Sequence, residues 1–68
     1  MSYNRRRFLQ ALLNQGASII REGGRHTIVA MATGRQCPVP RHADVNRILA
    51  KKIARQLGLP WSEIKKGL

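Results

Sequence analysis

The stretch GGRHTIVAMATG (residues 23–34) carries the strongest β-strand signal in the chain. Residues 26–33 are rich in strand-forming types, and both faces of such a strand are largely apolar. A strand that is apolar on both faces is typical of the centre of a sheet, so residues 26–33 are predicted to form a central strand. Glycines bound it on both sides and predict turns, with Gly23 and Gly24 able to supply positive φ angles.

Two shorter segments flank this central strand. Residues 17–21 contain two isoleucines and predict a strand that precedes it, joined by the tight connection of residues 22–25. Residues 35–39 predict a third strand after the turn at Gly34. Because proline cannot donate to a strand ladder, Pro38 and Pro40 confine the third strand to an edge or end it.

Apolar residues recur at helical spacing over residues 3–15, which predicts a first helix. Its apolar stripe consists of Phe8, Leu9, Leu12 and Leu13. Ser2 or Asn4 can cap its start, and Gly16 is positioned to end it.

A second helix is predicted over residues 45–57, with Asp44 as its N-cap. Its expected buried stripe consists of Val45, Ile48, Leu49, Ile53 and Leu57. Gly58 suits the left-handed position that ends a helix, and Pro60 can start a last helical turn over residues 61–65.

The expected order is therefore helix, three antiparallel strands, helix and short helix, in a single domain of residues 1–68. Two helices covering one face of such a sheet make a two-layer α+β fold. We see no apolar run of membrane-spanning length and no secretory signal, and the one cysteine cannot form an internal disulfide. We therefore expect a cytoplasmic protein with no membrane partner.

Positive charge dominates the composition. Thirteen Lys and Arg residues face three acidic residues, which gives a net charge of +10. Arginine donates bidentately to phosphate, and so lopsided a balance favours a polyanionic partner over a merely soluble basic domain.

Three motifs in this order resemble the HicA family of toxins. They are the helix ending at Gly16, the turn Gly23-Gly24-Arg25-His26 leading into Thr27-Ile28-Val29, and Val39-Pro40-Arg41-His42 before the second helix. The resemblance implies a fold similar to double-stranded-RNA-binding domains. It also implies a toxin of a type II toxin–antitoxin system that cleaves messenger RNA without a metal and is neutralised by a HicB antitoxin.

The chain departs from the family pattern at two positions. The family has a Gly-Ser-His tripeptide at the start of its second strand, and its serine is replaced by Arg25 here. The aromatic residue that commonly follows the first glycine is Ala17. The first departure leaves open whether the family's serine position has a catalytic role in this chain.

His26 is the candidate catalytic residue. Metal-free RNA cleavage uses the ribose 2′-hydroxyl as nucleophile and needs proton transfer near neutral pH, which imidazole can supply. A glycine turn beside it lets backbone approach a phosphate closely. On residue type alone a surface histidine in a turn is the simpler interpretation, and the match to the family's Gly-x-His position favours catalysis.

Other residues are candidates for binding phosphate. Arg25 would clamp a phosphate next to His26 or stand as a solvated charge, and Arg41 and His42 precede a helix N-terminus that attracts anions. His42 alternatively only orients the start of the helix. The full set of RNA- or phosphate-binding candidates is Gly24, Arg25, Arg41, His42, Arg47, Lys51, Lys52, Arg55, Arg5 and Arg6.

Cations repeat every four residues on the second helix at Arg47, Lys51 and Arg55, with Lys52 beside them. Like charges at this spacing repel, so we predict a contact face for RNA backbone or an acidic partner. No ligand set surrounds the two histidines, so we expect no metal and no small-molecule cofactor. A non-catalytic RNA-binding or regulatory module explains the charge equally well but gives His26 no task, and DNA binding is weaker because no recognition helix is evident.

Overall fold

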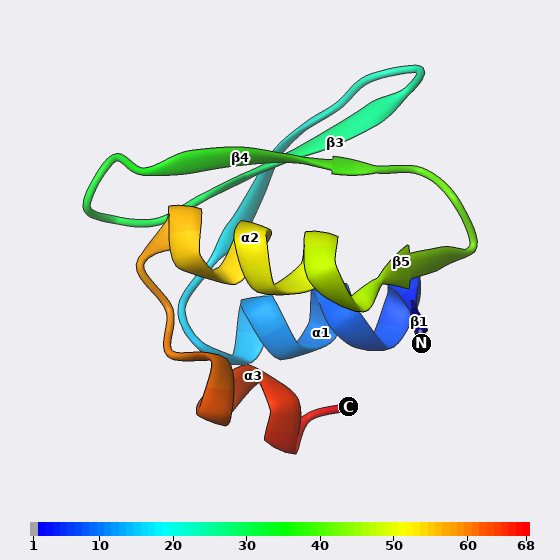
Figure 1. Cartoon of the computed structure of the whole chain (residues 1–68). Coiled ribbons are helices and arrows are strands. Elements are labelled where there is room, and N and C mark those ends of the chain that lie inside the picture. The colour runs from blue at the N-terminus through cyan, green and yellow to red at the C-terminus, as the bar shows by residue number, and fades with distance from the viewer. Residues whose placement is uncertain (1) are drawn as a thin grey trace.

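The computed structural model describes residues 2–68 and confirms the α+β class (Figure 1). Three strands form a sheet, and the helices lie on one side of it, which makes two layers. The elements in chain order are β1 (Ser2–Asn4), α1 (Arg5–Asn14), β2 (Ser18–Glu22), β3 (His26–Ala30), β4 (Gln36–Pro40), β5 (Asp44–Asn46), α2 (Arg47–Leu57) and α3 (Trp61–Lys66).

The sheet has the strand order β2-β3-β4, and both pairings are antiparallel. The prediction of a central strand and of a third strand at an edge is thus confirmed. β3 ends at Ala30, three residues earlier than its apolar composition predicted. In the β3–β4 ladder His26 pairs with Pro40 at one end and Ala30 pairs with Gln36 at the other.

A second, two-stranded ladder between β1 and β5 was not predicted. It shortens both predicted helices at their starts, because residues 2–4 and 44–46 pair with each other in extended backbone. Asn4 caps α1, as one of the two predicted options, and accepts from the Arg7 N–H at 3.1 Å. The N-cap of α2 is Asn46, which accepts from the Ile48 N–H at 2.8 Å, so the prediction of Asp44 as the cap is wrong.

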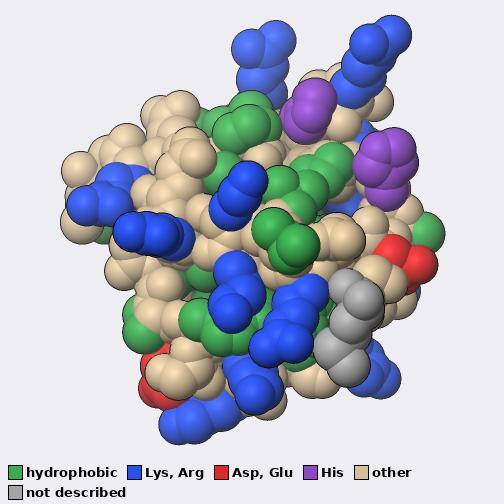
Figure 2. Space-filling model, in the orientation of Figure 1, with side chains coloured by type: hydrophobic (Ala, Val, Ile, Leu, Met, Phe, Trp, Pro, Cys, Tyr) green, Lys and Arg blue, Asp and Glu red, His purple; other side chains and the backbone are tan. Residues whose placement is uncertain are grey.

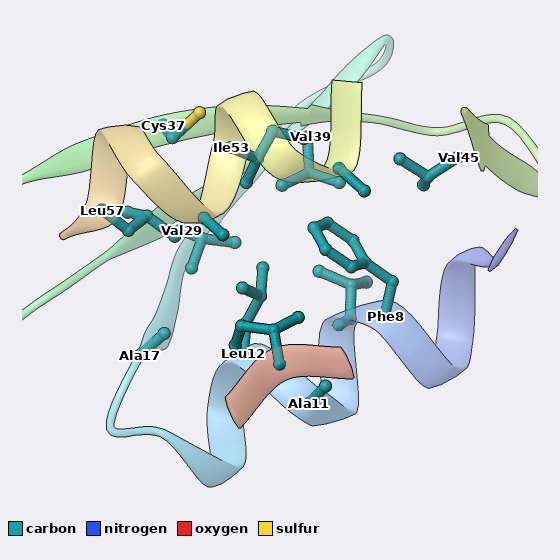
Figure 3. Packing of buried hydrophobic residues seen from close by; sticks show 14 residues of the cluster. Phe8, Ala11, Leu12, Ala17, Val29, Cys37, Val39, Val45, Ile53 and Leu57 are labelled. Carbon is teal, nitrogen blue, oxygen red and sulfur yellow. The ribbon is translucent and has the colours of Figure 1, made fainter. Parts of the chain in front are cut away.

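The core lies between the sheet and the helices, where Phe8 and Leu12 of α1 point toward Val29 and Val39 of the sheet (Figure 3). The buried face of α2 differs from the predicted stripe. Its buried residues are Ala50, Ile53, Ala54 and Leu57. Ile48 and Leu49 lie outside the core, and Val45 is buried but belongs to β5 and not to the helix. Alanine has no side chain beyond Cβ, so Ala50 and Ala54 let α2 approach closely, and the larger residues at 48 and 49 face outward.

Positive φ angles occur at Gly16, Gly34 and Gly58. Gly58 therefore ends α2 in the left-handed conformation, as predicted, with φ of 79°. Gly23 and Gly24 do not adopt positive φ, in contrast to the prediction for that turn. The connection instead closes through the Gly23 N–H, which donates to the His26 carbonyl at 2.9 Å.

α3 closes the end of the core opposite the sheet. Ile64 is fully buried, and Trp61 is half-buried against the core cluster. Pro60 precedes α3 in extended backbone. Across residues 2–68, none of the helices combines the length and the apolar character needed to cross a membrane.

Candidate active site

His26 is the first residue of β3, and its side chain is exposed. Successive side chains of a strand point to opposite faces. Thr27 and Val29 are fully buried on the face that the helices cover, so His26 belongs to the face that the helices leave open. The exposure that proton transfer to a polymer requires is therefore present.

A cavity of about 380 Å³ lies around this imidazole. Both histidines of the chain gather in one region of the surface (Figure 2). The lining residues come from the 23–25 connection, from β3 and from the end of β4 with its following loop, and they are Gly24, Arg25, His26, Pro40, Arg41 and His42. The pairing of His26 with Pro40 brings the two predicted motifs together, because it sets Arg41 and His42 next to the start of β3.

A second cavity, of about 500 Å³, adjoins the first. Arg41 and His42 line both cavities. The remaining lining residues of the second cavity are Asn4, Arg5, Arg6 and Ala43. Together the two cavities form a continuous cationic strip from the 23–25 connection to the start of α1, and we call this strip the His26 surface.

Arg41 holds the two loops of the His26 surface together. Its backbone N–H donates to the Arg25 carbonyl at 3.3 Å, and its Nη1 donates to the Gly23 carbonyl at 3.2 Å. The same Nη1 lies 3.9 Å from the Glu22 carboxylate. A guanidinium carries five N–H donors, so Arg41 keeps donors for a phosphate while it fixes the turn next to His26.

Arg5 is directed into the protein at the first turn of α1. Its Nε donates to the Pro40 carbonyl at 2.9 Å, and its Nη2 donates to the Thr27 hydroxyl at 2.6 Å. That hydroxyl donates in turn to Glu22 at 3.2 Å. Arg5, predicted as a phosphate contact, therefore ties α1 to the two strands that carry His26 and Pro40.

The sequence reasoning did not identify Thr27 and Glu22 as parts of the site. Thr27 is the one buried polar residue among the described residues, and it satisfies its hydroxyl through Arg5 and Glu22. A polar residue on the inward face of a central strand is a signal that could have indicated a buried polar partner. Nothing in the sequence indicates that Glu22 is that partner.

The predicted cations of α2 lie elsewhere. Lys51, Lys52 and Arg55 line a separate cavity, and Arg47 lines another with Tyr3, Lys65 and Leu68. Within residues 2–68 these cavities share no lining residue with the cavity around His26. The structure therefore divides the predicted RNA-binding residues between the His26 surface and two further cavities.

The His26 surface offers imidazole and guanidinium groups. In the described part of the chain neither imidazole has a side-chain hydrogen bond, so the ring nitrogens of His26 and His42 remain available to a ligand. No three His, Cys, Asp or Glu side chains gather anywhere in residues 2–68. Cys37 is buried in β4, and burial raises the pKa of its thiol, which disfavours the nucleophilic thiolate.

Comparison with protein families gives a match over most of the chain. A family described as "HicA toxin of bacterial toxin-antitoxin" matches residues 5–59, which include every residue of the His26 surface except Asn4. No curated protein matches the chain.

Proposed function

The chain belongs to the HicA toxin family of bacterial toxin–antitoxin systems, and on that premise we propose that it is a metal-independent endoribonuclease that cleaves messenger RNA. The observation that carries the proposal is the exposed imidazole of His26 in a cavity that it shares with His42 and two arginines. Imidazole exchanges protons near neutral pH, and guanidinium groups bind phosphate. These are the two kinds of group that RNA cleavage needs.

In the proposed reaction the ribose 2′-oxygen attacks the adjacent phosphorus and the bond from phosphorus to the 5′-oxygen breaks. His26 accepts the 2′-proton, or donates the proton that the 5′-oxygen takes up as it leaves. The products are a 2′,3′-cyclic phosphate and a 5′-hydroxyl, so the nucleophile comes from the RNA itself. Arg25 and Arg41 stand beside His26 and stabilise the negative charge that develops on the phosphorane.

The Arg25 side chain replaces the family's serine without removing the elements of this reaction. Arg25 is exposed at the rim of the cavity, next to His26. A guanidinium at this position binds a phosphate next to the cleaved bond through two N–H donors. We therefore assign Arg25 to phosphate binding and His26 to proton transfer.

The proposal extends to the partner and the compartment. An antitoxin that neutralises this toxin has to cover His26, and the net charge of +10 favours an acidic or apolar contact surface on it. Because messenger RNA is the substrate, the proposed site of action is the cytoplasm. The whole chain, residues 1–68, acts as one domain.

The test is cleavage of an end-labelled RNA by the purified protein. We expect fragments with 5′-hydroxyl ends, in the presence of a chelator as well as in its absence. A single 2′-deoxy substitution at the cut site removes the nucleophile, so cleavage at that position stops. Cleavage that survives the 2′-deoxy substitution, or that stops on chelation, contradicts the proposed reaction.

A non-catalytic RNA-binding module is the alternative. The cationic strip alone supports it, because phosphate contacts supply affinity without chemistry. The same incubation separates the two functions, since a binding module retards the RNA in a gel and leaves it intact.

A further inference from the structure

A groove of about 780 Å³ separates the outer face of α2 from the start of α3. Its walls combine apolar and cationic side chains, and Ile48 lies on α2 together with the cations. The lining residues are Ile48, Lys51, Lys52, Arg55, Gly58, Leu59, Pro60 and Trp61, and we call it the α2–α3 groove. Pro60 and Trp61 lie beyond residues 5–59, so part of this groove is built by the segment outside the family match.

The apolar residues of the groove are only partly covered by the rest of the chain. Ile48 is 67% exposed, although its position among apolar residues predicted burial. Leu59 and Trp61 pack against the core on one side and line the groove on the other. A large aliphatic side chain left in water beside other apolar groups marks a contact surface.

The positive charges of the groove are not balanced by negative charges in its lining. No acidic residue lines it. The two ion pairs of the described residues, Arg41 with Glu22 and Lys66 with Glu63, lie outside it. Lys and Arg side chains cover this face of α2 with apolar atoms between them (Figure 2). Charge complementarity therefore requires an anionic occupant.

The combination of apolar and cationic residues in the groove favours a protein over RNA as its occupant. A phosphate backbone would satisfy Lys51, Lys52 and Arg55, but it has no aliphatic groups to cover Ile48 and Leu59. Base stacking on Trp61 is restricted, because that ring is half-buried and already packs against Tyr3 with ring centroids 5.8 Å apart. An amphipathic helix supplies both chemistries at once, with apolar side chains in the groove and carboxylates at its rim.

We propose that the α2–α3 groove docks an acidic amphipathic segment of a partner protein, whose large apolar residues cover Ile48 and Leu59 while its carboxylates pair with Lys51, Lys52 and Arg55. This inference rests on the groove itself and is independent of the ribonuclease activity of His26.

The groove and the His26 cavity share no lining residue, and one end of the groove lies away from His26. The end of α2 lies at the end of the β3–β4 hairpin opposite His26, since the Gln56 side chain donates to the Gln36 carbonyl at 3.0 Å. Four residue steps along β3 separate His26 from Ala30, the partner of Gln36, which amounts to about 13 Å. A segment seated at the Gly58–Trp61 end of the groove therefore leaves the imidazole uncovered.

The experiment uses a fluorescent amphipathic peptide of about 16 residues, long enough to form a helix, with leucines on one face and glutamates on the other. A second peptide replaces every glutamate by lysine. We expect the acidic peptide to bind at least about tenfold more tightly than the basic one in fluorescence anisotropy, and to shift amide NMR signals of the groove residues. Absence of binding, equal affinities, or shifts at the β3–β4 end that carries His26 overturn the proposal.

Matched variants locate the binding. Ile48→Ser removes apolar contact and is expected to weaken the acidic peptide about tenfold. Ile20→Ser on β2, at a residue also more than half exposed, is expected to leave the affinity unchanged. Lys52→Glu is a second variant that leaves the apolar wall intact, and it is expected to shift preference toward the basic peptide. Equal effects of Ile48→Ser and Ile20→Ser contradict docking in the groove.

RNA is the competing occupant. If a single-stranded RNA displaces the peptide and Ile48→Ser weakens both ligands equally, the groove is an RNA surface and the proposal is wrong. We expect instead that Ile48→Ser cleaves RNA like the unmodified protein. A failure of the ribonuclease proposal leaves the peptide result unaffected, because neither peptide measurement depends on cleavage.

Discussion

Around His26, cationic side chains stand beside two imidazoles and a backbone turn, whereas in the α2–α3 groove they stand beside aliphatic and aromatic walls. The sign of the charge is the same in both regions. What differs is the neighbour of each cation, and the neighbour decides the chemistry. Net charge therefore favours a polyanionic or acidic partner, and only the local surroundings distinguish the region that we propose for proton transfer from the region that we propose for docking.

The largest expected effect breaks this comparison at His26, the proposed catalytic residue. Loss of a proton-transfer group costs about 10²–10⁴ in rate, so we expect His26→Ala to lower RNA cleavage by that factor while RNA affinity is retained. Cleavage rate constants and gel-shift affinities measure the two quantities separately. The groove variant Ile48→Ser is the control, and cleavage by His26→Ala at the unmodified rate would remove His26 from the reaction.

A second prediction compares how two neighbouring arginines of the His26 surface contribute to stability. Arg5→Ala loses hydrogen bonds to Thr27 and Pro40, so we expect its free energy of unfolding to fall by about 1–2 kcal/mol. Arg6 is exposed at the rim of the adjoining cavity. Arg6→Ala is expected to change stability by less than about 0.5 kcal/mol.

The two arginine variants should also differ in RNA binding. A cation that contacts one phosphate contributes about one unit to the slope of log affinity against log salt. We expect Arg6→Ala to reduce that slope by about one unit. Urea denaturation measures the stabilities, and salt titrations of RNA binding measure the slopes. Equal stabilities of the two variants would show that the Arg5 contacts do not stabilise the fold.

The smallest effect compares one glycine from each region. Gly58 adopts a φ of 79°, and an added Cβ there would meet the Arg35 side chain at 3.5 Å. We expect Gly58→Ala to destabilise the protein by about 1 kcal/mol. Gly24 has ordinary φ and no atom within 4 Å of an added Cβ, so Gly24→Ala should be neutral or slightly stabilising. Thermal unfolding of both variants gives the comparison, and the reverse order contradicts it.

The sequence was sufficient for the main architecture where a signal is local and strong. The apolar run after Gly24 predicted the central strand, and the positive φ expected at Gly58 is present. The β1–β5 ladder was missed because each strand has three residues and forms only through contact with a distant partner. Asp44 and Asn46 are both good N-caps, and that non-local pairing selects Asn46.

The face of α2 shows a different limit of prediction. Hydrophobicity alone favours burial of Ile48 and Leu49 over Ala50 and Ala54, and the structure does the opposite. The distance between α2 and the sheet decides which residues are buried, and this distance depends on tertiary packing that the helix sequence alone does not encode. In the same way the sequence predicted a phosphate site that includes His26 and His42, but it could not show that Arg5 points inward to Thr27.

The β1–β5 ladder has an electrostatic consequence. Because α1 and α2 both begin directly after it, their N-termini lie at the same end of the molecule, beside the loop that carries Arg41 and His42 (Figure 1). Each helix dipole places roughly half a positive charge at its N-terminus. The backbone therefore adds to the field of the side chains there, and an approaching polyanion would be steered toward that end before it makes any contact.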